Sequence, residues 1–289
     1  MATVSAHRTS KWFRLVLSTL LYSILTLTNL SVAYAQGEEG ENWATYIAQY
    51  DEGPGSVTLN MKLKEKAPLT AFPFAVVTGV VTGQCNEHGF PVPVELKKLY
   101  QVDDGVQAVL KLTGQSKHVG SFTYQCERLN YFYVRDTTNV RSKLLELYKR
   151  KHSEYKKPYI NIKSDPAWNY YLKFLYPNEE TRDYMANEQL IQQLKAAGDP
   201  LEKPRAVDHW LYFESKKDRD NFIHYATSQG FKVISTDYIE KSALSYQLRL
   251  SKEHKVDMIA INKATLQLRK KAAEYNGNYD GWETFVLKK

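Results

Sequence analysis

The sequence lacks the residue patterns that most catalytic and metal sites need. It contains no G-x-S-x-G motif, no H-E-x-x-H motif and no phosphate-binding glycine loop. Cys85 and His88 have C-x-x-H spacing, but no second pair of ligands lies nearby, so a zinc site is not predicted. We therefore expect a protein without a metal, without a cofactor and without catalytic residues.

Cysteine is scarce, because the 289 residues contain only two, Cys85 and Cys126. In an oxidising compartment two such cysteines can form a disulfide. Cys85 follows a strand-like run and Cys126 lies within another, so the sequence allows this bridge. Two separate, partly buried thiols are the alternative, and the sequence does not decide between them.

Long apolar runs are also scarce, and the only one lies at residues 15–32. Basic residues without any acid precede it: Arg8, Lys11 and Arg14. The small-x-small sequence Ala-Tyr-Ala follows at 33–35, as signal peptidase requires. This pattern predicts a signal peptide cleaved between Ala35 and Gln36, and a periplasmic or secreted protein with no stable membrane insertion after cleavage. An uncleaved membrane anchor is the alternative, because the run approaches the length of a short span.

The excess of positive charge is modest. The formal net charge of +7 includes the three cations of the N-terminal segment, so the chain from Gln36 carries +4. Basic residues cluster at 149–152, followed by Lys156 and Lys157. We interpret this cluster as the exposed end of a helix, where cations suit the helix dipole, and we expect no nucleic-acid partner.

Hydrophobic periodicity predicts an α+β fold in the first two thirds of the chain. The expected strands lie at 43–50, 56–63, 72–81 and 122–134, and a helix is expected at 93–112. A further unit has a strand at 130–135, a helix at 138–155, a hairpin at 159–162 and 168–175, and a helix at 179–197. Residues 201–205 are then expected to form a linker.

The C-terminal part has the order βαββαβ of a ferredoxin-like plait. Its expected elements are a strand at 207–213, a helix at 217–229, a hairpin at 231–239 and 244–250, a helix at 256–275 and a strand at 282–287. The unit from residue 130 aligns with this part at a spacing of roughly eighty residues. A related repeat within the N-terminal domain is one interpretation of this similarity, and chance is the other.

The segment 279–283, Tyr-Asp-Gly-Trp-Glu, also has two interpretations. Asp-Gly permits a tight turn, after which Trp282 would anchor the closing strand. Alternatively the segment contributes to an interaction surface for an unknown protein partner, because Trp and Tyr are favoured interface anchors. The residues of that hypothetical surface are Tyr279, Asp280, Trp282, Glu283 and His209.

Asp208 and His209 are adjacent, and such a pair can suggest acid–base chemistry. Neighbouring residues of a strand point to opposite faces of the sheet, so these two side chains cannot simply hydrogen-bond to each other. We therefore predict that His209 is a structural hydrogen-bonding residue, near Asp280 or Glu283.

Four aromatic residues lie close together at Tyr170, Tyr171, Phe174 and Tyr176. Such rings could form a platform for a sugar or a peptide. Alternation between core and surface along an amphipathic strand explains them equally simply, and we favour that interpretation.

Two parts of the chain resemble known families. Asp208-His209, the sequence Gly-Phe-Lys-Val at 230–233 and the segment 279–283 resemble the family named regulator of ribonuclease E activity B. The sequences Val-Val-Thr-Gly at 76–79, Gly-Phe-Pro at 89–91 and Asn-Tyr-Phe-Tyr-Val at 130–134 resemble domain of unknown function 695. The expected domains are a signal peptide at 1–35, the domain of unknown function at 36–198 and the ferredoxin-like domain at 206–289.

The resemblance implies a binding role without chemistry, since the named member of the first family inhibits a cytosolic ribonuclease by binding it. An exported protein cannot reach that enzyme, which suggests a shared scaffold with a changed partner. We expect a non-catalytic protein-binding or regulatory module of the bacterial cell envelope. The alternatives are a cytosolic ribonuclease regulator, if the signal is not cleaved, and an envelope hydrolase.

Overall fold

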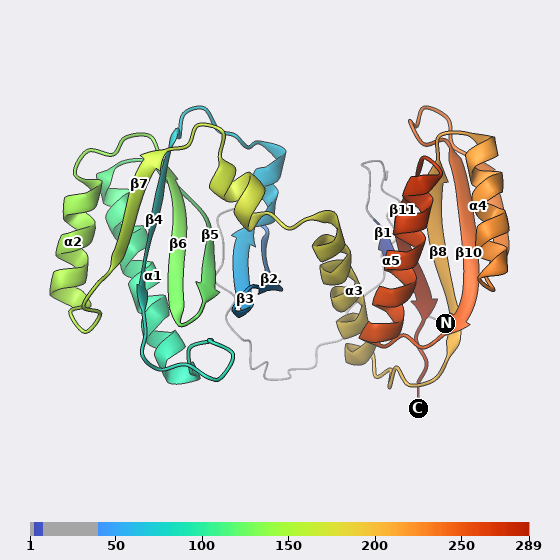
Figure 1. The fold of residues 1–289 in the computed structure, drawn as a ribbon, viewed down its shortest axis with the longest axis horizontal. Coiled ribbons are helices and arrows are strands. Elements are labelled where there is room, and N and C mark those ends of the chain that lie inside the picture. Colours follow the sequence, from blue (N-terminus) through green and yellow to red (C-terminus); the bar gives the residue numbers. More distant parts are fainter. Residues whose placement is uncertain (1–2, 8–39, 289) are drawn as a thin grey trace, which may run out of the picture. The chain divides into compact units, whose positions relative to one another are not determined.

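The computed structural model describes residues 3–7 and 40–288 and divides the chain into two compact units. The first runs from residue 40 to Pro177, and the second runs from Asn178 onward and includes residues 3–7 (Figure 1). The predicted cleavage between Ala35 and Gln36 lies outside the described residues. Among the described helices, none is both long and apolar enough to span a membrane.

The N-terminal unit is a six-stranded antiparallel sheet in the order β2-β3-β5-β6-β4-β7. Its strands are β2 (Trp43–Tyr50), β3 (Gly53–Asn60), β4 (Phe74–Val81), β5 (Ser116–Tyr124), β6 (Glu127–Val134) and β7 (Tyr159–Ser164). Its helices are the 3-10 helix η1 (Met61–Glu65), α1 (Pro93–Thr113), α2 (Val140–Lys151) and the π-helix η2 (Tyr170–Leu175).

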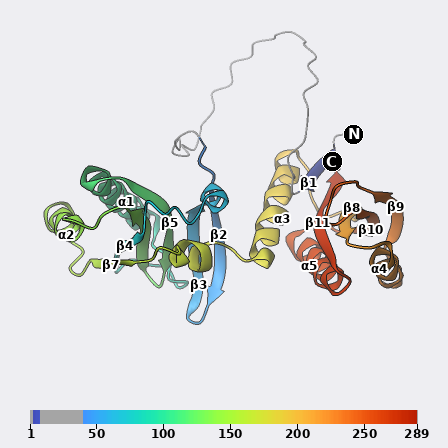
Figure 2. The same cartoon turned by 90° about the horizontal axis from the view of Figure 1, so that it is seen from above.

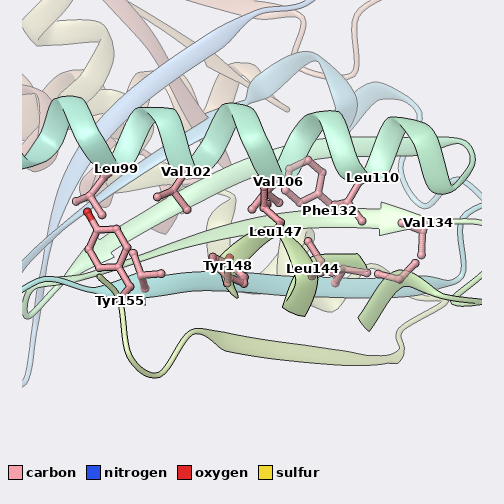
Figure 3. Packing of buried hydrophobic residues seen from close by; sticks show 13 residues of the cluster. Leu99, Val102, Val106, Leu110, Phe132, Val134, Leu144, Leu147, Tyr148 and Tyr155 are labelled. Carbon is pink, nitrogen blue, oxygen red and sulfur yellow. The ribbon is translucent and has the colours of Figure 1, made fainter. Parts of the chain in front are cut away.

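Helices α1 and α2 cover one face of this sheet. Leu99, Val102, Val106 and Leu110 recur at helical spacing along α1 and are all buried (Figure 3). They pack with Leu144, Leu147 and Tyr148 of α2 and with Phe132 and Val134 of β6. Because successive strand residues alternate between faces, Tyr131 and Tyr133 of β6 point to the opposite face.

The basic cluster ends α2 as predicted: Lys149, Arg150 and Lys151 form its last turn. The single β-rich run predicted at 122–134 is two strands, joined by a turn in which Gln125 and Cys126 have left-handed backbone conformations. Cys126 is joined to Cys85 in a disulfide, with 5.8 Å between the Cα atoms. This bridge ties the turn to the segment that leads into α1.

The disulfide gives a direct chemical prediction. In the unreduced, denatured protein, iodoacetamide should add no alkyl group, because both thiols are oxidised. After reduction the intact mass should gain two alkyl groups. Alkylation without prior reduction would show that the two cysteines are free thiols.

The hairpin predicted at 159–162 and 168–175 does not form. Tyr159–Ser164 is strand β7, but residues 170–175 are a π-helix, so no second hairpin strand exists there. Asp165 explains the difference, because its carboxylate accepts hydrogen bonds from the backbone amides of Asn169 and Tyr170 and starts a helical turn. The unit from residue 130 is therefore not a second plait, and the interpretation as a repeat is wrong.

The C-terminal unit has the predicted βαββαβ order. Its elements are β8 (Arg205–Phe213), α4 (Lys216–Ser228), β9 (Lys232–Tyr238), β10 (Tyr246–His254), α5 (Met258–Glu274) and β11 (Gly277–Phe285). The antiparallel order β11-β8-β10-β9 is that of a ferredoxin-like plait, and β1 (Thr3–His7) adds a fifth strand beside β11. Helices α4 and α5 pack on one face of the sheet over Leu211, Phe213, Leu248 and Leu250 (Figure 2).

Helix α3 (Glu179–Ala196), which was predicted to belong to the first domain, packs with the C-terminal unit. The amide of Asn187 donates to Thr265 of α5 at 3.0 Å and accepts from the Trp282 indole at 2.8 Å. Asp183 pairs with Arg269 of α5. The physical boundary between the units therefore lies before α3, at residues 177–178.

The expected linker at 201–205 is a fixed part of this unit. Asp199 and Arg205 form an ion pair whose side chains are 0% and 1% exposed. The Asp199 carboxylate also accepts hydrogen bonds from the backbone amides of Leu201 and Leu287, at 2.8 and 2.7 Å. Burial opposes ionisation, but these donors and Arg205 together hold the pKa of Asp199 below its ordinary value.

Candidate functional site

The face of the C-terminal sheet opposite its helices carries a group of polar and aromatic side chains. Strand β8 alternates strictly between buried and half-buried residues, which places Asp208, Trp210 and Tyr212 on this face. Gln247 and Arg249 of β10 lie opposite Tyr212 and Trp210, and Glu283 of β11 lies opposite Asp208. We call Asp208, Trp210, Tyr212, Gln247, Arg249 and Glu283 the open face, because the described helices of this unit pack on the other side.

An ion network holds the centre of the open face. The Arg249 guanidinium donates to Asp208 at 2.6 Å and to Glu283 at 3.4 Å, and thereby joins three strands. The same guanidinium lies 4.8 Å from the centre of the Trp210 ring, within cation–π range. Two acids share one arginine, so the network presents a net negative charge.

Tyr212 extends the open face along β8. Its hydroxyl accepts a hydrogen bond from the Gln247 amide at 2.8 Å. Burial and the nearby Asp280 carboxylate raise the pKa of Tyr212, although the bond from Gln247 lowers it. At this end of the open face, the neutral phenol of Tyr212 therefore lies near the carboxylate of Asp280.

The segment 279–283 does not form the predicted turn. It lies within β11, and the pairing with β8 shifts between Tyr279 and Gly281, so Asp280 is the extra residue of a β-bulge. Gly281 has a φ of 153°, a backbone conformation that other residues rarely adopt. The turn into β11 lies earlier, at Asn276, which has a φ of 51°.

Three of the five residues of the predicted interaction surface lie in the core. Tyr279, Trp282 and His209 are at most 2% exposed and point toward the helices, so they cannot contact a partner. The indole of Trp282 bonds to α3, as described above. Glu283 does belong to the open face, and Asp280 lies beside it.

His209 is structural, as predicted, but its partner is not an acid. Its Nδ1 lies 2.9 Å from the Tyr279 hydroxyl, and its Nε2 lies 3.5 Å from Nε2 of His254. Burial, together with the nearby His254 and Lys252, lowers the pKa of His209 to about 3. Asp208 points to the other face and bonds to Arg249, so the two adjacent residues form no relay.

Both acids of the open face, Asp208 and Glu283, are paired with Arg249. In the part of the chain that the structure describes, no group of three His, Cys, Asp or Glu side chains could hold a metal ion.

Family comparisons agree with the two units. Residues 41–176 match the family of unknown function DUF695, and residues 185–284 match the family described as "Regulator of ribonuclease activity B", RraB. The chain joins a DUF695 domain to an RraB domain. The RraB match begins within α3, which agrees with the packing of that helix on the plait. RraB is a non-catalytic regulatory family, and the activity of the DUF695 domain is unknown.

Other comparisons are less informative. No curated protein matches the chain. The matching crystal structures include an unknown protein from Galdieria sulphuraria and a putative glycine cleavage system transcriptional repressor, each 9% identical. They cover 74% and 75% of this chain and 99% and 98% of their own, with TM-scores of 0.20 and 0.19.

Sequence reasoning missed most of the open face of the RraB domain. The motif at 279–283 drew attention to β11, whereas Trp210, Tyr212 and Arg249 belong to none of the motifs that resemble a known family. Their signal was the period of two along 205–213, in which the apolar positions Val207, Leu211 and Phe213 mark the inner face. The residues between them then had to be on the outer face.

Proposed function

We propose that the RraB domain regulates a protein partner by binding it through the open face. The half-buried residues Trp210, Tyr212 and Arg249 of the open face support this, because Trp, Tyr and Arg are the residue types most often dominant in protein interfaces. Within the network the carboxylates of Asp208 and Glu283 outnumber the guanidinium of Arg249, which favours a partner with basic residues at the contact.

Site-specific photo-crosslinking in the native host tests this proposal. A Trp210→benzoylphenylalanine variant should form an adduct of defined higher mass after irradiation, because the ring lies at the centre of the open face. The matched control is the same substitution at Tyr184, which is 43% exposed on α3, away from that face. Equal adducts at both positions, or none at Trp210, would contradict binding through the open face.

We further propose that the chain is exported and begins at Gln36 after processing. The basic, apolar and small-residue pattern of the first 35 residues supports this. Processing would also remove β1, the strand that pairs with β11. The mature RraB domain would then keep its four-stranded sheet and present β11 as an edge.

Hydrogen exchange should report this loss. In a chain that starts at Gln36, amides of β11 between Gly281 and Phe285, which pair with residues 3–7 in the full chain, should exchange faster. Amides of β10 should be unaffected, because that strand is central in both forms. Identical β11 exchange in the two chains would mean that β1 contributes no protection.

The mass of the protein from its native host decides between the two locations. A mass starting at Gln36 would support an envelope role and exclude contact with a cytosolic ribonuclease. A soluble cytosolic form that retains residues 3–7 would contradict export and favour a ribonuclease regulator, the function for which the family is named.

A further inference from the structure

The DUF695 domain carries a group of aromatic rings, ranging from buried Tyr131 to exposed Phe174, that the proposed function does not use. They lie on the sheet face opposite α1 and α2 and form a chain of contacts. Ring centres are 5.1 Å apart for Tyr50 and Phe122, 5.2 Å for Phe122 and Phe174, and 5.8 Å for Phe174 and Tyr131. We call Tyr50, Phe122, Tyr124, Tyr131, Tyr170 and Phe174 the ring patch.

A strained segment presents two of these rings. Trp168 has a φ of 55°, which is unusual for a bulky residue, and its buried indole stacks on Tyr133 at 4.1 Å. The π-helix follows directly, and such helices are rare and frequent at functional sites. Its turn buries Tyr171 but leaves Tyr170 half-buried and Phe174 38% exposed.

A cavity of about 380 Å³ adjoins these two rings, a size typical of small-molecule sites. Its lining combines two rings with four polar side chains: Lys163, Ser164, Asp165, Asn169, Tyr170 and Phe174. The Lys163 ammonium lies 4.4 Å from the centre of the Tyr170 ring, and the Tyr170 hydroxyl accepts from Asn161 at 3.2 Å.

The only carboxylate in this lining, that of Asp165, already accepts hydrogen bonds from neighbouring groups of the domain. Asp165 accepts hydrogen bonds from the Tyr133 hydroxyl at 2.6 Å, from the Asn169 amide group at 2.7 Å, and from the backbone amides described above. Burial opposes ionisation, yet these donors keep the pKa of Asp165 below its ordinary value. A single carboxylate held as an acceptor cannot supply the acid and the second carboxylate that glycoside hydrolysis needs.

We propose that the ring patch and its cavity bind a neutral oligosaccharide without cleaving it. The C–H face of a pyranose packs on aromatic rings, while its hydroxyls require amide, hydroxyl and ammonium groups such as those of Asn169, Ser164 and Lys163. The lining holds one cation, Lys163, and one anion, Asp165, whose charges offset each other, so it offers no strong field for a charged ligand. A cavity at the end of a ring patch suits a compact sugar unit better than an extended peptide, which would need a continuous groove.

Calorimetric titration of the full chain with chitohexaose, cellohexaose and maltohexaose tests the proposal. At least one should bind, and a Tyr170→Ala/Phe174→Ala variant should bind it at least about tenfold more weakly, because two stacking surfaces are lost. Tyr100→Ala is the matched control, since Tyr100 is a 50% exposed ring of α1, on the helical side of the same domain. Its affinity should be unchanged.

Far-UV circular dichroism establishes that each variant is folded. Absence of binding to all three hexasaccharides by the wild-type chain would overturn the proposal. Unchanged affinity in the folded double variant would overturn it too. Ring-dependent binding of a proline-rich peptide, with no saccharide bound, would assign the patch to peptide recognition instead.

Discussion

Replacing Asp199 by asparagine should lower the free energy of unfolding of the RraB domain by about 3–5 kcal/mol. The substitution leaves the Arg205 guanidinium, which is 1% exposed, without its counter-charge. It also removes one of the two oxygens that accept from the backbone amides of Leu201 and Leu287. An unpaired buried charge cannot be solvated, so the cost exceeds that of a lost hydrogen bond.

The Trp282 indole N–H provides a readout that belongs to the RraB domain alone, because it is buried and donates to Asn187. Its NMR signal followed through a urea titration should disappear at a lower midpoint in Asp199→Asn. The matched control is Asp220→Asn, because Asp220 is 40% exposed and pairs with Lys216 and Arg219 at the surface. That variant should differ by less than about 1 kcal/mol, and an equal loss in both variants would contradict a special role for the buried pair.

The same ion pair explains an error of sequence reasoning. The sequence Gly-Asp-Pro at 198–200 is typical of a turn that ends a helix, and residues 201–205 were therefore predicted to form a linker. The sequence does not show which acid pairs with which arginine in the interior. This pairing depends on the tertiary structure, because β11 has to return beside residues 199–205. The composition of this segment correctly indicated a turn, but it could not show that the buried ion pair between Asp199 and Arg205 holds the turn in place.

Elements with strong periodicity were predicted well. Helix α1 ends within one residue of its prediction, and β2 matches it fully, because their apolar spacing admits only one interpretation. The prediction of a strand at 168–175, where the structure has a π-helix, was wrong because local sequence preference there is overridden by side-chain hydrogen bonds. Tyr170, Tyr171 and Phe174 suit a strand by propensity, and the hydrogen bonds that Asp165 makes to the following amides override it.

The two sites differ in how far the sequence could lead. At the open face, the alternation along β8 fixes which side chains point outward, and only the partners of Arg249 required the structure. At the ring patch, Tyr50, Phe122 and Phe174 come from three segments that are distant in sequence. Local pattern carries no information on that convergence, since it depends on the order of strands in the sheet.

Acid should destabilise the RraB domain through His209. The pKa of this buried imidazole is about 3 in the folded domain, against about 6.5 in an unfolded chain. Between these values the unfolded chain binds a proton that the folded domain excludes, so lowering the pH favours unfolding. The contribution is fully present above pH 6.5 and falls by up to about 1.4 kcal/mol for each pH unit below it.

Urea titrations of the Trp282 indole signal at a series of pH values measure this slope. His209→Gln should lower stability at neutral pH, because Gln replaces a ring packed against Phe231 and Tyr279. Its stability should nevertheless depend less on pH between 6.5 and 4, because the variant lacks the imidazole that only the unfolded chain protonates in this range. Of the two paired histidines only His254 then remains, and burial lowers its pKa as well. His224→Gln, on the exposed side of α4, should keep the wild-type slope. An unchanged slope in His209→Gln would show that acid acts on the RraB domain through other groups.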